Sequence, residues 1–194
     1  WNYNNSIREY ICNFIMSKLE TNTIDTVSGT TNLTIGSTNS STVTFENGAA
    51  TGHCYPAWSA FLNADQSVAN ATVTKVTMNQ ENFDTDSAFD TSTNRFTVPS
   101  GKAGNYFVTA QIRVGSSSDF DSLYIYIKKN GSDFLFNAER NEFRNGVSIT
   151  HCVPLVAGDY LDVHIYNGHS TSVNVQGTTG GNRSTFFSGF RIGA

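Results

Sequence analysis

The chain has 194 residues, a formal net charge of −4 and a sequence pI of about 5.5, and 14% of its residues are charged. This length suits one domain with its own core plus an appendage. The lack of a basic stripe argues against a nucleic-acid partner. The lack of an apolar run near the roughly 20 residues that cross a bilayer argues against membrane insertion.

Residues 1–20 carry a helical pattern. Ser6 and Glu9 have the spacing of a capping box, and apolar residues follow at helical spacing: Ile7, Ile11, Phe14, Ile15 and Leu19. This stripe needs a partner, which can be the same subunit, a symmetry-related copy in a short coiled coil, or another protein. The chain starts at Trp1 without an initiator Met or a signal-peptide pattern, so we expect it to be the C-terminal part of a longer polypeptide.

Residues 21–54 are rich in Thr, Ser, Asn and Gly. Their apolar residues come in short alternating pairs, Leu33 with Ile35 and Val43 with Phe45, and each pair ends in a turn signal. Such a segment is either a flexible linker or a fibrous β shaft whose thin core is completed by identical copies. Its texture resembles the shafts of viral fibres.

Short strands and turns follow one another from residue 55 to residue 194. Every second residue from Tyr106 to Val114 is apolar, which predicts a strand with one buried face. Phe107 lies on the other face and predicts that this face is partly covered by another sheet or subunit. Ten segments read as strands: 58–62, 73–78, 96–98, 106–114, 123–128, 134–138, 147–153, 160–166, 173–175 and 186–192. Many strands without a helix between them predict an all-β antiparallel sandwich or barrel.

Turn residues and cysteines add detail. Asn130-Gly131 predicts a tight hairpin, and Ala157-Gly158-Asp159 predicts a second turn. Pro154 interrupts an apolar run, which predicts an edge strand or a bulge. The three cysteines, Cys12, Cys54 and Cys152, lack the spacing of a zinc site. We expect reduced, buried thiols, with a bridge between Cys54 and Cys152 as the alternative.

Six short segments occur in a set order between Trp58 and Phe190. They are Trp58-Ser59-Ala60-Phe61, Phe89-Asp90-Thr91-Ser92-Thr93-Asn94-Arg95-Phe96-Thr97-Val98-Pro99, Gly104-Asn105-Tyr106-Phe107, Leu123-Tyr124-Ile125-Tyr126-Ile127-Lys128-Lys129-Asn130-Gly131, Leu155-Val156-Ala157-Gly158-Asp159-Tyr160-Leu161 and Phe187-Ser188-Gly189-Phe190. Together they resemble the globular head of complement C1q, within the tumour-necrosis-factor superfamily of trimeric jelly rolls.

The resemblance implies a ten-stranded antiparallel jelly-roll sandwich, association as a homotrimer, and a binding module rather than an enzyme. Asn94 stands where the family often has Gly, a tolerable change because Asn accepts a left-handed backbone. The calcium that some family members carry maps onto no motif of this chain. Asp84 with Asp86 and Asp119 with Asp121 are oxygen-rich pairs of the kind that can hold structural calcium, but solvated loops are the expected explanation.

Two strands present tyrosines opposite an apolar face. In 123–128 and 160–166 the Leu, Ile and Val residues fall on one face and the tyrosines on the other. Tyrosine is favoured where a surface is covered by protein but stays partly wet. We therefore expect a trimer interface, with a solvated face as the alternative, formed by Phe107, Tyr124, Tyr126, Tyr160 and Tyr166.

Several polar residues invite a catalytic or metal-binding interpretation. Asp162 and His164 share a face and could serve Ser148 or Ser188, but no Gly-x-Ser-x-Gly nucleophile elbow occurs, so we expect no enzyme. His151 alternates in phase with Val147, Ile149, Val153 and Leu155, which predicts a buried neutral histidine. His53-Cys54 and His151-Cys152 could jointly bind a metal, but core positions are the expectation.

The sequence predicts the head of a virus or phage fibre, displayed on the virion surface. Residues 1–20 would anchor or trimerise the chain, 21–54 would form a short shaft, and 55–194 would bind a host-surface glycan or protein. Receptor contacts are expected on loops at one end of the jelly roll: Asp119, Phe120, Asn141, Arg144, His169, Asn182 and Arg183. The alternatives are a secreted, lectin-like C1q-type recognition protein and a purely structural capsid or tail component.

Overall fold

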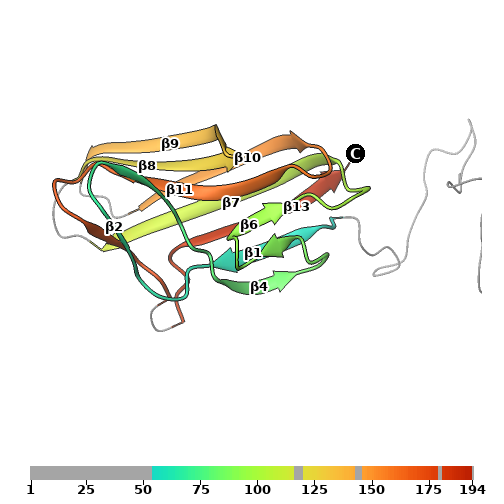
Figure 1. Cartoon of the computed structure of the whole chain (residues 1–194), viewed down its shortest axis with the longest axis horizontal. Coiled ribbons are helices and arrows are strands. Elements are labelled where there is room, and N and C mark those ends of the chain that lie inside the picture. Colours follow the sequence, from blue (N-terminus) through green and yellow to red (C-terminus); the bar gives the residue numbers. More distant parts are fainter. Residues whose placement is uncertain (1–53, 116–119, 143–145, 179–180, 194) are drawn as a thin grey trace, which may run out of the picture. The chain divides into compact units, whose positions relative to one another are not determined.

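The computed structural model describes residues 54–115, 120–142, 146–178 and 181–193. These residues form thirteen strands and no helix, so none of them supplies a helix that could cross a membrane. Two antiparallel sheets pack face to face as a sandwich (Figure 1). The predicted helix at 1–20 and the predicted shaft at 21–54 lie outside the described residues, residue 54 excepted.

The first sheet has seven strands in the order β2-β12-β7-β13-β1-β4, with β10 also paired to β7. The second sheet has six strands in the order β5-β6-β11-β8-β9, with β3 also paired to β11. The strand bounds are β1 Ala57–Phe61, β2 Gln66–Val68, β3 Thr72–Lys75, β4 Gln80–Asp84, β5 Phe89–Asp90, β6 Arg95–Thr97, β7 Gly104–Gly115, β8 Phe120–Lys129, β9 Ser132–Glu142, β10 Gly146–Leu155, β11 Tyr160–Asn167, β12 Val173–Val175 and β13 Phe186–Gly193.

All ten predicted strands have a counterpart, and three further strands make thirteen rather than ten. The additions are β2, β4 and β5. Strand β4 reads Gln-Glu-Asn-Phe-Asp and is exposed at four of its five positions, so it lacks the apolar alternation that marks a strand in a sequence. Pairing with β1 holds it in the sheet.

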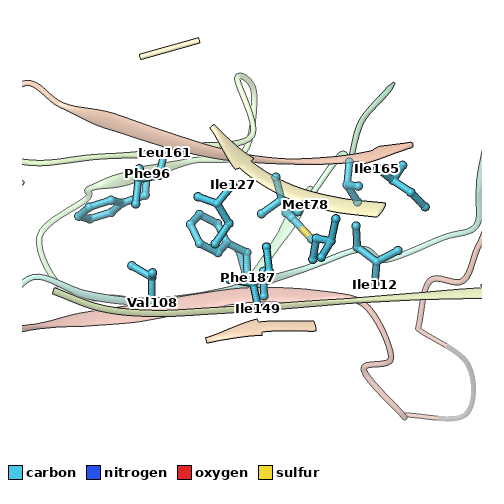
Figure 2. Close-up of a cluster of buried hydrophobic side chains, with 14 of the residues drawn as sticks. Met78, Phe96, Val108, Ile112, Ile127, Ile149, Leu161, Ile165 and Phe187 are labelled. Atoms are coloured by element: carbon cyan, nitrogen blue, oxygen red, sulfur yellow. The ribbon is translucent and has the colours of Figure 1, made fainter. Parts of the chain in front are cut away.

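The core lies between the sheets and follows the predicted alternation. In β7, Tyr106 and every second residue to Val114 are fully buried, as predicted. Strands β8 and β11 bury their Leu, Ile and Val residues against the same layer. Figure 2 shows side chains of both sheets meeting in this layer: Met78, Phe96, Val108, Ile112, Ile127, Ile149, Leu161, Ile165 and Phe187.

An aromatic cluster fills one part of the core. The Trp58 ring stacks on Phe96 with centroids 3.7 Å apart and meets the edge of Phe187 at 5.4 Å. Gly189 lies against the same indole, and a Cβ at this position would overlap the Trp58 ring and the Phe107 carbonyl. The glycine of Phe187-Ser188-Gly189-Phe190 is therefore needed for the tryptophan to fit.

Two turns are tied to each other by a polar cluster, the turn lock, formed by Lys129, Asn130, Asp159 and Tyr160. Asn130 and Gly131 have φ angles of 53° and 83°, as the predicted tight hairpin requires. Asn130 Nδ2 donates to Asp159 Oδ1 (2.7 Å), and Tyr160 N donates to Asn130 Oδ1 (2.9 Å). Lys129 Nζ lies 2.9 Å from Asp159 Oδ2. Burial alone would raise the pKa of Asp159, but hydrogen bonds from Lys129 and other donors outweigh it and lower that pKa.

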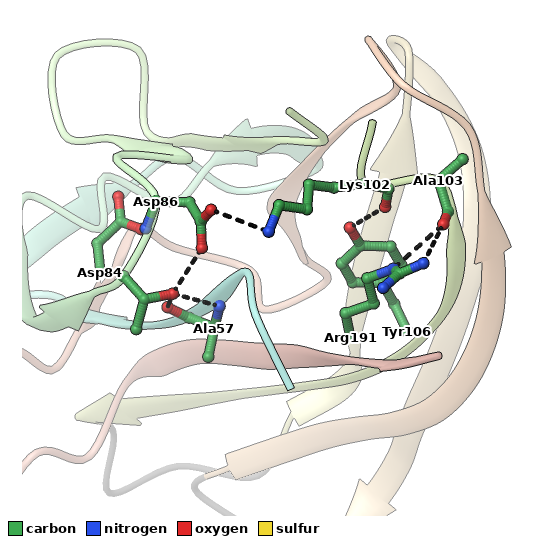
Figure 3. A network of polar contacts seen from close by, with 8 residues as sticks. Ala57, Asp84, Asp86, Lys102, Ala103, Tyr106 and Arg191 are labelled. Atoms are coloured by element: carbon green, nitrogen blue, oxygen red, sulfur yellow. Dashed lines mark hydrogen bonds and ion pairs between the residues drawn. The ribbon is translucent and has the colours of Figure 1, made fainter. Parts of the chain in front are cut away.

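A second polar network fixes the end of the sandwich where β1 begins and β13 ends (Figure 3). Tyr106 donates its hydroxyl to Lys102 O (2.6 Å), and Arg191 donates from Nε and Nη2 to Ala103 O (3.1 and 2.9 Å). Lys102 Nζ lies 3.5 Å from Asp86 Oδ1. Burial raises the pKa of Tyr106 to about 12, so its hydroxyl stays a donor at neutral pH.

Two local predictions are confirmed by the backbone. Asn94 has a φ of 54°, the left-handed conformation that it was expected to tolerate. Pro154 lies on β10, which pairs only with β7 and is an edge strand.

Candidate binding surfaces

The outer face of the first sheet carries an apolar row, the phenylalanine face, formed by Ala57, Phe107, Cys152 and Phe190. Phe107 and Phe190 stack with ring centroids 5.2 Å apart and planes 27° apart. Ala57 pairs with Phe190, and Cys152 pairs with Phe107, so the four side chains follow one line across β1, β13, β7 and β10. Phe190 is 38% exposed although it is a large apolar residue.

Hydroxyl groups form the next row of this face. Ser59 and Ser188 bond to each other at 2.9 Å, and so do Thr109 and Thr150. The pairs stand in register across neighbouring strands. The hydroxyls bond to one another, so these two rows present apolar rings and satisfied hydroxyl groups without a formal charge.

The outer face of the second sheet carries a different cluster, the tyrosine face, formed by Tyr124, Tyr126, Phe136 and Tyr166. The rings form two pairs: Tyr124 and Tyr166 are tilted to each other (centroids 5.2 Å apart, planes 31° apart), and Tyr126 and Phe136 are stacked (6.0 Å, 25°). The pairs meet at a steep angle, because the Tyr124 and Tyr126 planes differ by 71°. Phe136 is 64% exposed, whereas the three tyrosines are half-buried.

Paired charges border the tyrosine face on β11 and its neighbours. Asp162 is only 4% exposed and lies 2.8 Å from Lys75 Nζ and 3.0 Å from His164 Nε2. Burial alone would raise the pKa of Asp162, but hydrogen bonds from His164 and Lys75 outweigh it and lower that pKa. Lys128 pairs in turn with Asp133 at 3.1 Å.

The five predicted interface residues therefore fall into three places. Phe107 lies on the phenylalanine face of the first sheet. Tyr124, Tyr126 and Tyr166 lie together on the outer face of the second sheet. Tyr160 belongs to the turn lock, where Arg95 stacks over its ring at 4.1 Å. Phe136, which the sequence prediction missed, completes the tyrosine face.

Strand pairing brings the predicted receptor residues to one end of the sandwich. The connections β7–β8, β9–β10, β11–β12 and β12–β13 leave the sheets at the same end, because Phe120 pairs with Glu142, Gly146 with Arg113 and Asn174 with Gly115. Phe120 and Asn141 lie in β8 and β9 near this end, the loop end. Asp119 and Arg144 are outside the described residues.

The other three predicted receptor residues are described at the loop end. The half-buried His169 accepts a hydrogen bond at Nδ1 from Thr171 N (3.1 Å). Arg183 is exposed and stacks over the Phe61 ring at 4.6 Å, and Asn182 beside it is exposed too. Arg183 covers an outward-facing phenylalanine that would otherwise meet water.

A shallow groove of about 230 Å³ opens between the edge strands β9 and β10, and its lining includes Leu135, Phe136, Asn137, Ile149 and His151. His151 keeps the predicted phase with Ile149 and Val153, but it is exposed and not buried. The prediction of a core histidine is wrong because the two sheets do not close over this edge. The ring instead bonds through Nδ1 to Cys152 O (2.7 Å).

The thiols also differ from the expectation. Cys54 and Cys152 are both free and exposed, so neither the buried thiols nor the alternative bridge is observed. Cys152 is exposed because it pairs with Phe107, whose side chain points out of the sandwich. Cys12 and His53 lie outside the described residues.

The hydrolase candidates do not come together. Ser188 bonds to Ser59 on the outer face of the first sheet, whereas His164 bonds to Asp162 on the outer face of the second sheet. Among the residues with described positions, no group of three His, Cys, Asp or Glu side chains could hold a metal ion. At the Asp84 and Asp86 pair, carboxylate oxygens accept from Phe89 N (2.8 Å) and face Lys102 (3.5 Å).

No protein-family model matches the sequence of the chain. The phage-like element PBSX protein XkdV of Bacillus subtilis (strain 168) is 29% identical over 129 residues, which are 61% of this chain and 18% of that protein. The chain is thus distantly similar to XkdV and spans less than a fifth of its length.

Solved structures share the fold at low sequence identity. The PRD1 vertex protein P5 aligns with a TM-score of 0.55 at 15% identity, over 73% of this chain and 99% of that one. Murine APRIL at pH 8.0 gives 0.52 at 14% identity, over 70% and 97%. The globular domain of zebrafish complement 1qA protein gives 0.49 at 19% identity, over 71% and 97%. The fold is a C1q/tumour-necrosis-factor-like jelly roll.

Proposed function

We propose that the chain is a non-catalytic, trimeric module of a phage or phage-like particle that attaches the particle to a host surface. The similarity to XkdV, a protein of a phage-like element, carries this proposal. The fold shared with a viral vertex protein supports it. Nothing in the described site geometry favours hydrolysis, because His164 and Ser188 lie on opposite sides of the sandwich.

The proposed trimer uses the phenylalanine face. In a closed ring each subunit contacts its neighbours through two different surfaces that lie at an angle to each other. The two outer faces of a sandwich point in opposite directions, so a contact between them would build an open stack. The phenylalanine face and the adjoining β9–β10 edge satisfy the requirement, with Phe107 and Phe190 meeting the Leu135 and Ile149 groove of the next subunit.

This arrangement uses only one of the five interface residues predicted from the sequence. Phe107 is kept, whereas Tyr124, Tyr126 and Tyr166 point away from the proposed contact and Tyr160 serves the turn lock. The predicted helix at 1–20 and shaft at 21–54 remain the proposed link to the particle. The first described residue, Cys54, precedes β1, and β1 begins at the end opposite the loop end.

Attachment through the loop end places the recognition residues away from that link. Asn182 and Arg183 are the exposed, described members of the predicted set. A purely structural role is the second candidate, since the neighbour PRD1 P5 is described as a vertex protein.

A cell-binding assay tests the proposal and separates the two candidates. Fluorescent chain 1–194 is added to a panel of Gram-positive bacteria that includes Bacillus subtilis, and bound label is counted by flow cytometry. We expect saturable binding that the double variant Asn182→Ala, Arg183→Ala weakens at least about tenfold, or about 1.4 kcal/mol. The control Val156→Ser changes a residue that is 62% exposed in the β10–β11 turn, at the other end, and should bind normally. Absence of binding to every strain would leave the structural role.

A further inference from the structure

The tyrosine face lies away from the loop end, and of its four residues only Phe136 lines the groove that the proposed trimer fills. We propose that this face binds an uncharged saccharide, whose sugar ring stacks on the exposed side of Phe136, next to the tyrosines. The inference rests on the proposed attachment role, which it extends by naming a class of ligand and the face that binds it.

The ring geometry suits a sugar. The face of an aromatic ring is electron-rich, and the C–H bonds on one side of a pyranose are weakly positive, so the two stack with favourable contact. Phe136 stacks on Tyr126 with ring centroids 6.0 Å apart and planes 25° apart, so Tyr126 supports one side of the Phe136 ring. Phe136 is 64% exposed, so a ligand can reach it.

A β-bulge places Phe136 on this face. The hairpin pairs Lys129 with Ser132 and Lys128 with Asp133, but the next pair is Ile127 with Leu135. In an unbroken register Phe134 would pair with Ile127, so Leu135 would stand opposite Tyr126 and Phe136 would point into the sandwich. Bulges re-aim side chains beside binding sites. An outward phenylalanine on an edge strand is otherwise an aggregation hazard, so its presence calls for a ligand.

The charges around the face argue for an uncharged partner. Asp162 is satisfied by Lys75 and His164, and Lys128 is paired with Asp133. A phosphate, sulfate or ammonium group would therefore have to compete with existing ion pairs. The tyrosine side chains supply polar tips next to apolar rings, which matches a ligand that has both a C–H face and hydroxyl groups.

The small exposed area argues against a protein partner. A stable protein interface buries about 800 Å² on each side. An aromatic side chain offers about 150 to 250 Å² when fully exposed, and three of the four rings here are half-buried. Their remaining area is far below what a second copy or another protein needs, whereas single sugar rings need only one or two aromatic faces.

Affinity electrophoresis of the full chain 1–194 tests the inference. Native gels contain dextran, mannan, galactan or the polysaccharide fraction released from cells that bind the chain, and dextran sulfate serves as the charged comparison. We expect a neutral polysaccharide to retard the chain, and the double variant Tyr126→Ala, Phe136→Ala to bind at least about tenfold more weakly. Tyr126→Phe keeps the ring and should stay within about twofold. The matched control is Phe83→Ala, an aromatic residue on the first sheet that is 52% exposed.

Each outcome decides the inference. Retardation by a neutral polysaccharide that depends on Tyr126 and Phe136, with normal behaviour of Phe83→Ala, supports it. Retardation by no neutral polysaccharide, by dextran sulfate alone, or equally for the double variant overturns it. Binding of the chain to whole cells is measured separately, so the attachment role can stand when the saccharide assignment falls.

Discussion

The two outer faces of the sandwich both carry aromatic rings but differ in what surrounds them. On the phenylalanine face, Phe107 and Phe190 are bordered by a methyl group, a thiol and paired hydroxyls. On the tyrosine face, Tyr126 and Phe136 are bordered by a buried carboxylate with its lysine and histidine partners. Desolvating the first face costs little, whereas covering the second would strip water from ion pairs. Aromatic content alone therefore does not identify a subunit interface, and the polar neighbours decide.

The largest effect that separates the faces should be on assembly. Phe190→Asp places a charge in the proposed interface, and we expect at least about 100-fold weaker trimer association, or about 2.7 kcal/mol. Sedimentation velocity over a range of protein concentrations measures it. The matched variant Val73→Asp alters the other face, beside Tyr166, at a residue that is 50% exposed and should remain trimeric. A monomeric wild-type chain, or dissociation caused by Val73→Asp instead, would contradict the comparison.

The next effect should be on folding stability and should be specific to the second sheet. Asp162→Asn leaves Lys75 and His164 without their carboxylate, and we expect the free energy of unfolding to fall by about 2 kcal/mol. Urea denaturation at pH 7 measures the change. Asp133→Asn breaks the Lys128 pair at a carboxylate that is 62% exposed, so it should cost less than about 0.5 kcal/mol. Equal losses for both variants would mean that burial of Asp162 contributes nothing.

The smallest effect should be the acid dependence of stability. Asp162 and Asp159 have lowered pKa values, and hydrogen bonds from Ser92 and Thr93 lower the pKa of Asp90 to about 2. A lowered pKa stabilises the fold at pH values above the unfolded carboxyl pKa of about 3.9, and this stabilisation is lost as the pH falls through the folded value. We expect urea midpoints to be level from pH 7 to about 4.5 and to fall below about pH 4. The slope should be shallower in Asp162→Asn, and an identical slope would assign the loss to other carboxylates.

The strands of the core could be predicted because alternate residues of a strand point to the same side of the sheet and are buried together. Tyr106 to Val114 alternates in the sequence, and the same alternate residues are buried in β7. The resemblance to C1q heads added the order of the elements, which alternation cannot supply. The missed strands are short or polar: β4 depends on pairing with β1, a contact between residues 19 to 26 positions apart that leaves no periodic signal.

At the edge of the sandwich, the alternation of residues along a strand no longer predicts which side chains are buried. His151 has the phase of a core residue, yet it is exposed because β9 and β10 border an open groove. Cys152 has the opposite phase and is exposed as well. Whether an inward position is covered depends on how closely two edges approach, which is a property of the folded sandwich and not of the strand.

The binding surfaces could be predicted only in part. Tyr124 and Tyr126 of β8 and Tyr166 of β11 were expected to share a face, and they do, because each strand alternates and the two strands pair directly. Phe136 could not be predicted. The Asn130-Gly131 hairpin suggests an unbroken register that puts Leu135 beside Tyr126, and the bulge at Phe134 shifts it by one residue.

The turn lock bears on which residues of the sandwich are free to change. Lys129, Asn130, Asp159 and Tyr160 hold two strand pairs together at one end, and the Tyr106, Lys102 and Arg191 network closes the same region. The described residues of the connections at the opposite end take no part in either network. They can be exchanged without loss of either network, and under the proposed attachment role such exchanges would change what the loop end binds while the frame stays the same.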